Sequence, residues 1–191
     1  MTAAKAMIYL AVTQAHPDFA PQGFCAVERY STEVEFLCLP GDVAQAMAAC
    51  LKQHSPACEW ACHDMPGLMP DAGKVFLKGF IDFIFCDRGR YYIVDWKSNL
   101  LPAYDAISMT SHVWQNFAEQ IVIYRHALGL MLRQYHPGED ESALEERFGG
   151  VIYVFLRGIG AQGEGGCVFF SAETLAECLG DARLGRCGAG V

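Results

Sequence analysis

Residues 79–97 read GFIDFIFCDRGRYYIVDWK. Most of these residues are aromatic or β-branched, which is typical of buried strands, and the polar residues 87–90 between the two apolar runs favour a tight turn. The stretch nevertheless places Asp82, Asp95 and Lys97 among apolar neighbours. It therefore predicts a β-hairpin that carries two acids and a base into the middle of a sheet.

The turn determines how the two acids face each other. If residues 88–89 form the loop of the hairpin, the register places Asp82 directly opposite Asp95, with Cβ atoms about 4.5–5.5 Å apart. Lys97 lies two residues after Asp95 and therefore points to the same face of the sheet. A loop of another length would shift this register by a residue.

Two carboxylates at this separation repel each other, and burial increases the cost. A divalent cation such as Mg²⁺ or Mn²⁺, which prefers carboxylate oxygens, offsets the repulsion. The neighbouring Lys97 can then hold an attacking water or stabilise charge on a phosphate oxygen. The alternatives are a proton shared by the two acids, or acids at a sheet edge that pair with Lys97 and Arg90. The apolar flanking runs argue against an edge.

The other segments predict a mixed α/β protein in which helices flank a central sheet. Residues 24–39 contain an alternating strand, and Asp42 can cap a helix over 43–54. The best helical pattern covers residues 113–135, with Phe117, Ile121, Tyr124, Leu128 and Met131 on one buried face. The remaining predictions are a loop at 55–73, a buried strand at 150–156, a glycine-rich turn at 158–166, a strand at 167–170 and a helix from Ser171 to about Leu179.

Composition excludes some classes of protein. The chain has 191 residues, is 52% hydrophobic and carries a formal net charge of −8, so it can bury a core but has no general basic surface. If it binds nucleic acid, a local patch or a partner must supply the attraction. We find no signal peptide and no apolar run of about 18 residues, so we expect a cytoplasmic protein without a membrane segment.

The nine cysteines predict no metal or disulfide framework. Most are single and lie among apolar residues, as small hydrophobic side chains do in a reducing compartment: Cys25, Cys38, Cys50, Cys86 and Cys167. Only Cys58, Cys62 and His63 cluster, and no second ligand pair follows at the spacing of a zinc site. We interpret this cluster as part of a loop.

Asp82 followed by Asp95-Trp96-Lys97 fits the D…(D/E)xK pattern of restriction-endonuclease-like nucleases, which is loose by itself. The surrounding segments are more specific: LKGFIDFIF at 77–85, GRYYIVDWKSN at 89–99, EQIVIYRHAL at 119–128 and FGGVIYVFLRG at 148–158. In this order, they resemble the C-terminal nuclease domain of the RecB subunit of exodeoxyribonuclease V, in the PD-(D/E)xK superfamily. The similarity extends from about Val34 to Arg157.

The resemblance implies a restriction-endonuclease-like fold in which Asp82 and Asp95 bind the metal and Lys97 is the catalytic lysine. Gln120 and Tyr124 match the QxxxY motif of the family, and their spacing puts them on one helix face towards the active site and the DNA. For Tyr124, a core aromatic residue with a satisfied hydroxyl is an equally open interpretation. Gln120 is harder to assign to the core, because amides are poor core residues.

Glu33 and Glu35, in TEVEFLCLP, resemble the acidic strand of the family, where one glutamate lies near the metal. Alternation along a strand puts both on the same face, so the sequence does not say which of them this is. A solvated strand face explains both glutamates equally well.

The activity implied is that of a Mg²⁺-dependent exodeoxyribonuclease, with Mn²⁺ as a possible substitute, that hydrolyses phosphodiester bonds and leaves 5′-phosphate ends. The DNA would be single-stranded and fed in by a helicase or by RecC- or RecD-like partner subunits. The process would be double-strand break repair and degradation of foreign DNA. The alternative is an inactive module of the same fold that binds DNA ends or protein.

One departure from the family concerns the N-terminal part. RecB-type domains begin with a helix that carries a histidine metal ligand, and we find no such motif here. His16 precedes Pro17 and is more ordinary as a loop residue than as a replacement ligand.

We expect a single domain over 1–191 with a frayed tail at 181–191, which is either a fragment of a longer protein or a stand-alone relative with a reduced site. No P-loop motif is present, so a helicase portion is absent from this sequence.

Overall fold

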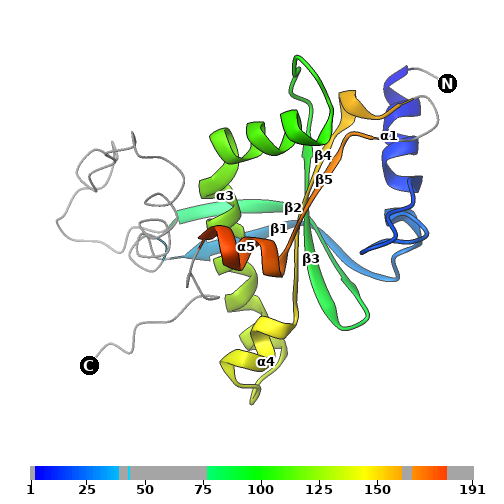
Figure 1. Ribbon diagram of the computed structural model, residues 1–191. Coiled ribbons are helices and arrows are strands. Elements are labelled where there is room, and N and C mark those ends of the chain that lie inside the picture. Colours follow the sequence, from blue (N-terminus) through cyan, green and yellow to red (C-terminus); the bar gives the residue numbers. More distant parts are fainter. Residues whose placement is uncertain (1–2, 39–42, 44–76, 161–164, 180–191) are drawn as a thin grey trace.

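A computed structural model describes residues 3–38, 43, 77–160 and 165–179 of the chain (Figure 1). Its strands form one five-stranded sheet in the order β1-β2-β3-β4-β5. The strands are β1 (Arg29–Cys38), β2 (Leu77–Asp87), β3 (Arg90–Lys97), β4 (Phe148–Phe155) and β5 (Cys167–Ser171). The helices are α1 (Ala3–Thr13), α3 (Ala106–Tyr135), α4 (Glu141–Glu146) and α5 (Ala172–Leu179), with 3₁₀ turns η1 (Phe24–Ala26) and η2 (Leu156–Gly158).

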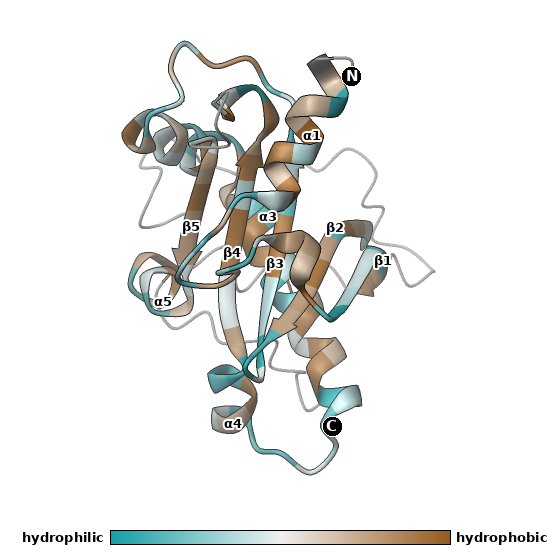
Figure 2. Cartoon of the chain, turned by 90° about the vertical axis from the view of Figure 1, so that its right-hand side faces the viewer, coloured by the Kyte–Doolittle hydropathy of each residue, from teal (hydrophilic) through white to brown (hydrophobic). Residues whose placement is uncertain are grey.

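The sheet is mixed. β3 and β4 are parallel and are joined through α3, whereas the other neighbouring strands are antiparallel. Helix α3 covers one face together with α4 and α5, and α1 covers the other (Figure 1). Figure 2 views the sheet from the α1 side and shows hydrophobic colouring along β4 and β5. The predicted α/β fold, a mixed sheet flanked by helices, is therefore confirmed.

The β2–β3 hairpin has the predicted register. Asp87 pairs with Arg90, so the loop consists of Arg88 and Gly89. Both loop residues have positive φ, 48° and 80°, as the two-residue turn that suits a twisted hairpin requires. The ladder ends at the pair Phe83–Val94, one step before the two acids would pair.

Strand β2 is irregular at Asp82. Ile81 and Phe83 both have partners on β1, whereas Asp82 between them does not. Its counterpart in this register is Glu33, which has a φ of 50° that non-glycine residues rarely adopt. Ile81 packs in the core on the α3 side and Phe83 in the core on the α1 side, although residues two apart in a regular strand share a face. The strand therefore rotates at Asp82.

Helix α3 is longer than its apolar pattern predicts. It begins at Ala106 rather than 113, because Asp105 accepts a hydrogen bond of 3.0 Å from the backbone N–H of Ser108 and so caps the first turn. Its end at Tyr135 is as predicted. The expected face packs against the core: Ile121, Tyr124 and Leu128 are buried, and Phe117 and Met131 are half-buried.

Two helices do not follow from the sequence pattern. The apolar residues of α1 are spread around the helix, so no periodic stripe distinguishes it from the mixed segment that the pattern predicts at 1–23. α4 lies in the polar connector after α3 and starts where Asp140 caps the N–H of Ala143 at 2.9 Å. Within the described residues, no helix is long and apolar enough to cross a membrane.

Most of the remaining predicted elements are confirmed. β4 begins two residues earlier than predicted and is buried along its whole length, and β5 and α5 lie where expected. Of the cysteines interpreted as small hydrophobic side chains, Cys38 is buried and Cys86 and Cys167 are half-buried, whereas Cys25 is exposed and does not fit that interpretation. Several predictions lie outside the described residues: the helix 43–54 apart from Val43, the loop 55–73, Cys50, Cys58, Cys62, His63 and the tail 181–191.

Candidate active site

A buried ion pair lies where β3 passes under α3. Asp95 and Lys97 are two residues apart on β3 and point to the same face of the sheet, as predicted. Lys97 Nζ lies 2.6 Å from Asp95 Oδ1, and the side chains are 12% and 4% exposed. Because water is largely excluded, these charges are poorly screened and each depends on its protein partners.

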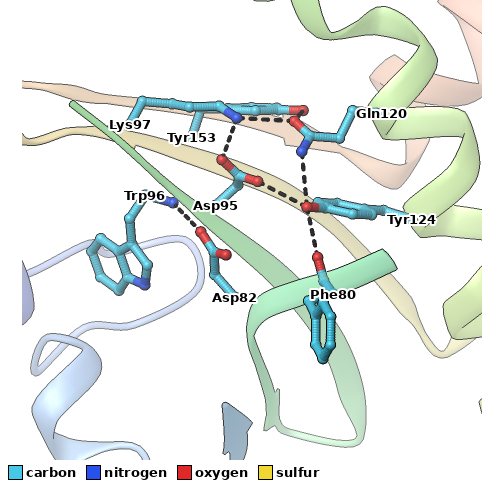
Figure 3. Close-up of polar contacts among 8 residues, drawn as sticks. All are labelled: Phe80, Asp82, Asp95, Trp96, Lys97, Gln120, Tyr124 and Tyr153. Atoms are coloured by element: carbon cyan, nitrogen blue, oxygen red, sulfur yellow. Dashed lines mark hydrogen bonds and ion pairs between the residues drawn. The ribbon is translucent and has the colours of Figure 1, made fainter. Parts of the chain in front are cut away.

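Gln120 on α3 connects the lysine to the helix. Its Oε1 accepts hydrogen bonds from Lys97 Nζ at 3.0 Å and from the Tyr153 hydroxyl at 3.2 Å, and its Nε2 donates to the Tyr124 hydroxyl at 2.8 Å (Figure 3). A lysine ammonium has only donors, so the oxygen of the amide must face it. The orientation of Gln120 is therefore fixed by Lys97.

Tyr124 lies one helical turn beyond Gln120. Its hydroxyl is 3.0 Å from the backbone oxygen of Phe80 and 3.1 Å from Asp95 Oδ2, and its single proton is donated to one of these at a time. Burial, and next the negative charge of Asp95, raise the pKa of the Tyr124 hydroxyl far above its ordinary value. Tyr124 thus remains a protonated donor, and it belongs both to the core stripe and to this site.

Asp82 lies beside the ion pair. Its Oδ2 accepts a hydrogen bond of 3.0 Å from the backbone N–H of Trp96, the residue between Asp95 and Lys97 (Figure 3). The regular ladder stops one pair short, so the acids are brought together by the register and by this hydrogen bond rather than by direct strand pairing. Asp82, Asp95, Lys97, Gln120 and Tyr124 therefore form one continuous group.

The pKa of Asp95 is raised above its ordinary value. Burial is the main cause, and the charge of Asp82 acts in the same direction. The ion pair with Lys97 and the hydrogen bond from Tyr124 lower the pKa but do not cancel the effect of burial. The negative charge of Asp95 is thus costly unless another cation comes close.

The two glutamates of β1 are not gathered around this group. Glu33 and Glu35 are both exposed, and Glu35 forms an ion pair of 3.0 Å with Lys78. The predicted regular alternation is interrupted by the positive φ of Glu33. In the parts of the chain that the structure describes, no three His, Cys, Asp or Glu side chains cluster closely enough to hold a metal ion.

Comparison with known proteins agrees with this arrangement. Residues 7–182 match the family described as the PD-(D/E)XK nuclease superfamily, which is most of the 191-residue chain. The chain belongs to the PD-(D/E)XK nuclease superfamily. The mixed sheet with its flanking helices is the restriction-endonuclease-like fold of that superfamily.

Relatives in three bacteria are each named RecBCD enzyme subunit RecB. The chain is 42% identical to the one from Escherichia coli (strain K12) over 88 residues, which are 44% of this chain and 7% of the relative. For Haemophilus influenzae, identity is 34% over 112 residues, 54% of this chain and 9% of the relative. For the relative from Borreliella burgdorferi, identity is 26% over 138 residues, which are 70% of this chain and 10% of the relative. The chain thus spans a tenth or less of these relatives.

Nucleases of the PD-(D/E)XK superfamily typically use divalent metals, and two carboxylates fit such an ion. Mg²⁺ usually binds through one or two carboxylates and completes its shell with waters and substrate phosphate. Asp82 and Asp95 supply that number, and each oxygen has lone pairs beyond the contacts described above. A cation between them would also relieve the repulsion that contributes to the raised pKa of Asp95. The donor set therefore suits Mg²⁺ or Mn²⁺.

His16 is not part of this group. It is buried between Phe19 and Phe24 on the α1 side of the sheet, with ring centroids 4.8 Å and 5.2 Å away, whereas Asp95 and Lys97 face α3. Burial lowers the pKa of His16. Helix α1 contains no histidine, so it does not supply the histidine ligand expected of RecB-type domains.

Three contacts of the site are missed by reasoning from the sequence. Tyr153 looks like one more apolar residue of β4, yet its hydroxyl holds Gln120. The other two are backbone groups, the oxygen of Phe80 and the N–H of Trp96, which carry no side-chain signal at all. For Tyr153, the available hint is that a hydroxyl in a fully buried strand needs a partner.

The pKa of Asp95 should respond in opposite directions to two substitutions. Asp82→Asn removes a nearby negative charge and should lower it, whereas Lys97→Met removes the paired cation and should raise it. The measurement is the pH titration of the Asp95 carboxyl carbon by ¹³C NMR in metal-free protein. Asp105, which caps α3 in solvent, serves as an internal control that should not move. Shifts of Asp95 in the same direction would contradict this electrostatic description.

Proposed function

We propose that the chain is a divalent-metal-dependent DNA nuclease domain that hydrolyses phosphodiester bonds. The observation that carries this is the nearly inaccessible Asp95–Lys97 ion pair beside Asp82. A buried ion pair is often no more stabilising than well-packed apolar residues. The stability of the fold is therefore a poor explanation for three charged side chains at this place. The superfamily match and the likeness to RecB support the same role.

In this proposal, Asp82 and Asp95 hold Mg²⁺, or Mn²⁺ in its place. When bound, the ion supplies a Lewis acid for the phosphoryl oxygen and a water of lowered pKa. Lys97 presents its ammonium to the negative charge that develops on the phosphate. Gln120 orients that ammonium through its Oε1, and Tyr124, which stays protonated, orients Asp95 and Gln120 together.

Glu33 is the better candidate for a third acid near the metal. It is the register counterpart of Asp82 on β1, at the point where the pairing with β2 is interrupted. Glu35 lies opposite Phe80 instead and is already paired with Lys78. An exposed acid without a regular strand partner can turn towards a cation at lower cost than one in an ion pair.

The substrate and partners follow from the likeness to RecB. We propose that the DNA is single-stranded and that a helicase or RecC- or RecD-like subunits deliver it, in double-strand break repair and the degradation of foreign DNA. The net charge of −8 supports delivery by a partner, because the chain has no general basic surface to attract DNA. We place this exodeoxyribonuclease activity in the cytoplasm.

Cutting of labelled DNA tests the function. The native chain should cut single-stranded DNA with Mg²⁺ or Mn²⁺ and not with EDTA, and Asp95→Asn and Lys97→Met should each lower the rate by about 10²- to 10³-fold. Asp87→Asn is the matched control, because this acid lies at the exposed end of the same hairpin and pairs with Arg88. Circular dichroism verifies that each variant is folded.

A folded native chain that fails to cut with either metal would contradict the proposal. Binding of single-stranded DNA without cutting would then favour an inactive module of the nuclease fold.

The two glutamates of β1 should differ in their contribution to cutting. Glu33→Gln should lower the rate by about 10- to 100-fold, as loss of a group near a metal does. Glu35→Gln should change it by no more than about threefold, because it removes only an exposed ion pair with Lys78. Rates at saturating Mg²⁺ and the apparent Mg²⁺ affinity would be measured for both. Equal effects would contradict the assignment of Glu33.

A further inference from the structure

We propose that Phe117 is a positioning residue for Lys97 and holds its ammonium by a cation–π interaction. Lys97 Nζ lies 3.9 Å from the centroid of the Phe117 ring. The Tyr153 ring also lies beside the ammonium, with its centroid 5.4 Å from Nζ, and it stacks on Phe117 with the two ring centroids 5.7 Å apart. We call Phe117, Tyr153 and Gln120 the ammonium cage. The proposal rests on the function proposed above.

Each N–H donor of the Lys97 ammonium has a partner. It has three N–H donors, and three partners surround it: Asp95 Oδ1, Gln120 Oε1 and the face of Phe117. An aromatic face is the negative part of the ring quadrupole and attracts a cation within about 6 Å. The side chain of Lys97 is only 12% exposed, so water weakens this attraction little.

The ammonium cage matters because Asp95 has other partners and cannot hold the Lys97 ammonium by itself. Its two oxygens already contact Lys97 and Tyr124, and in the proposed function it must also bind a metal. A carboxylate shared with a divalent cation attracts the ammonium less strongly. Phe117 and Gln120 contact Lys97 without sharing an atom of Asp95, and they lie three residues apart on α3, so they hold Lys97 from one side of the helix.

The neutrality of the cage suits the reaction. A carboxylate in the place of Phe117 would also hold the ammonium, but it would repel an incoming phosphate and neutralise the positive charge of Lys97. An aromatic face fixes the position of the cation and adds no net charge. Lys97 can therefore still attract the phosphate while its own position is restrained.

A purely apolar role for Phe117 makes a different prediction. The ring is half-buried, packs against the core and also contacts His112 edge-on at 5.6 Å. If shape and burial were its only contribution, changing the electron density of the ring at constant size would have little effect. If the ring holds Lys97, that change alone must weaken the attraction between the ring and the ammonium and lower the rate of cutting.

The test replaces Phe117 with phenylalanine carrying one, two and three fluorine atoms. Fluorine withdraws electron density from the ring face with little change in shape, so the attraction to a cation weakens stepwise. The rate of cutting single-stranded DNA at saturating Mg²⁺ should fall with each fluorine, by about tenfold over the series. The same series at Phe169 is the matched control, since that half-buried ring lies on the other face of the sheet against Phe19 and Tyr92. Its rates should stay level.

A second readout does not need activity. The ε-methylene group of Lys97 is bonded to Nζ, which lies 3.9 Å from the Phe117 ring centroid, so its NMR signals should be displaced by the ring current and return towards ordinary values in Phe117→Leu. Phe117→Tyr, which keeps an aromatic face, should retain both the displacement and the rate.

The outcomes separate this proposal from the one on which it rests. If the native protein cuts DNA and the fluorinated Phe117 proteins cut it equally fast, the role of Phe117 is overturned and the nuclease function stands. Native protein that does not cut overturns the nuclease function. In that case, Lys97 signals unchanged by Phe117→Leu also overturn the cage, whereas signals that lose their displacement support it.

Discussion

The buried carboxylate of Asp95 is the constraint on which the site depends. A charge taken out of water is tolerated only if protein groups replace its hydration. Lys97 comes from the same strand, and Tyr124 comes from α3. Gln120 joins these two partners and reaches Tyr153 on β4. The packing of α3 on β3 and β4 is thus tied to the geometry of one carboxylate.

The opposite face of the sheet supports the same site from behind. The indole of Trp96 packs edge-on against Phe24 and Phe83, with centroids 5.5 Å and 6.4 Å away, while its backbone N–H holds Asp82. The α1 side therefore fixes the residue between Asp95 and Lys97. The irregularity of β2 at Asp82 is what lets that acid leave the ladder and approach the ion pair.

Local chemistry in the sequence predicts part of this structure. The Arg88-Gly89 turn set the hairpin register correctly, because a two-residue loop leaves one pairing. The spacing of Gln120 and Tyr124 placed both on one face of α3. The start of α3 was missed because Thr110, Ser111 and His112 interrupt the apolar pattern before Val113. The positive φ of Glu33 has no signal in the composition. The contact between Tyr153 and Gln120 depends on how β4 lies under α3, which a strand pattern does not encode.

The position of a bound cation tests the central claim most directly. Crystals of the protein soaked in Mn²⁺ would be measured for anomalous scattering at the manganese edge. If Asp82 and Asp95 hold the metal, a peak should lie between them, about 2.1 Å from a carboxylate oxygen of each, as hard cations of this size require. Lys97 should still contact Gln120 and Phe117 in the Mn²⁺-bound protein. No peak at the two acids, or a peak elsewhere on the chain, would contradict the assignment of this buried group as a metal-dependent nuclease site.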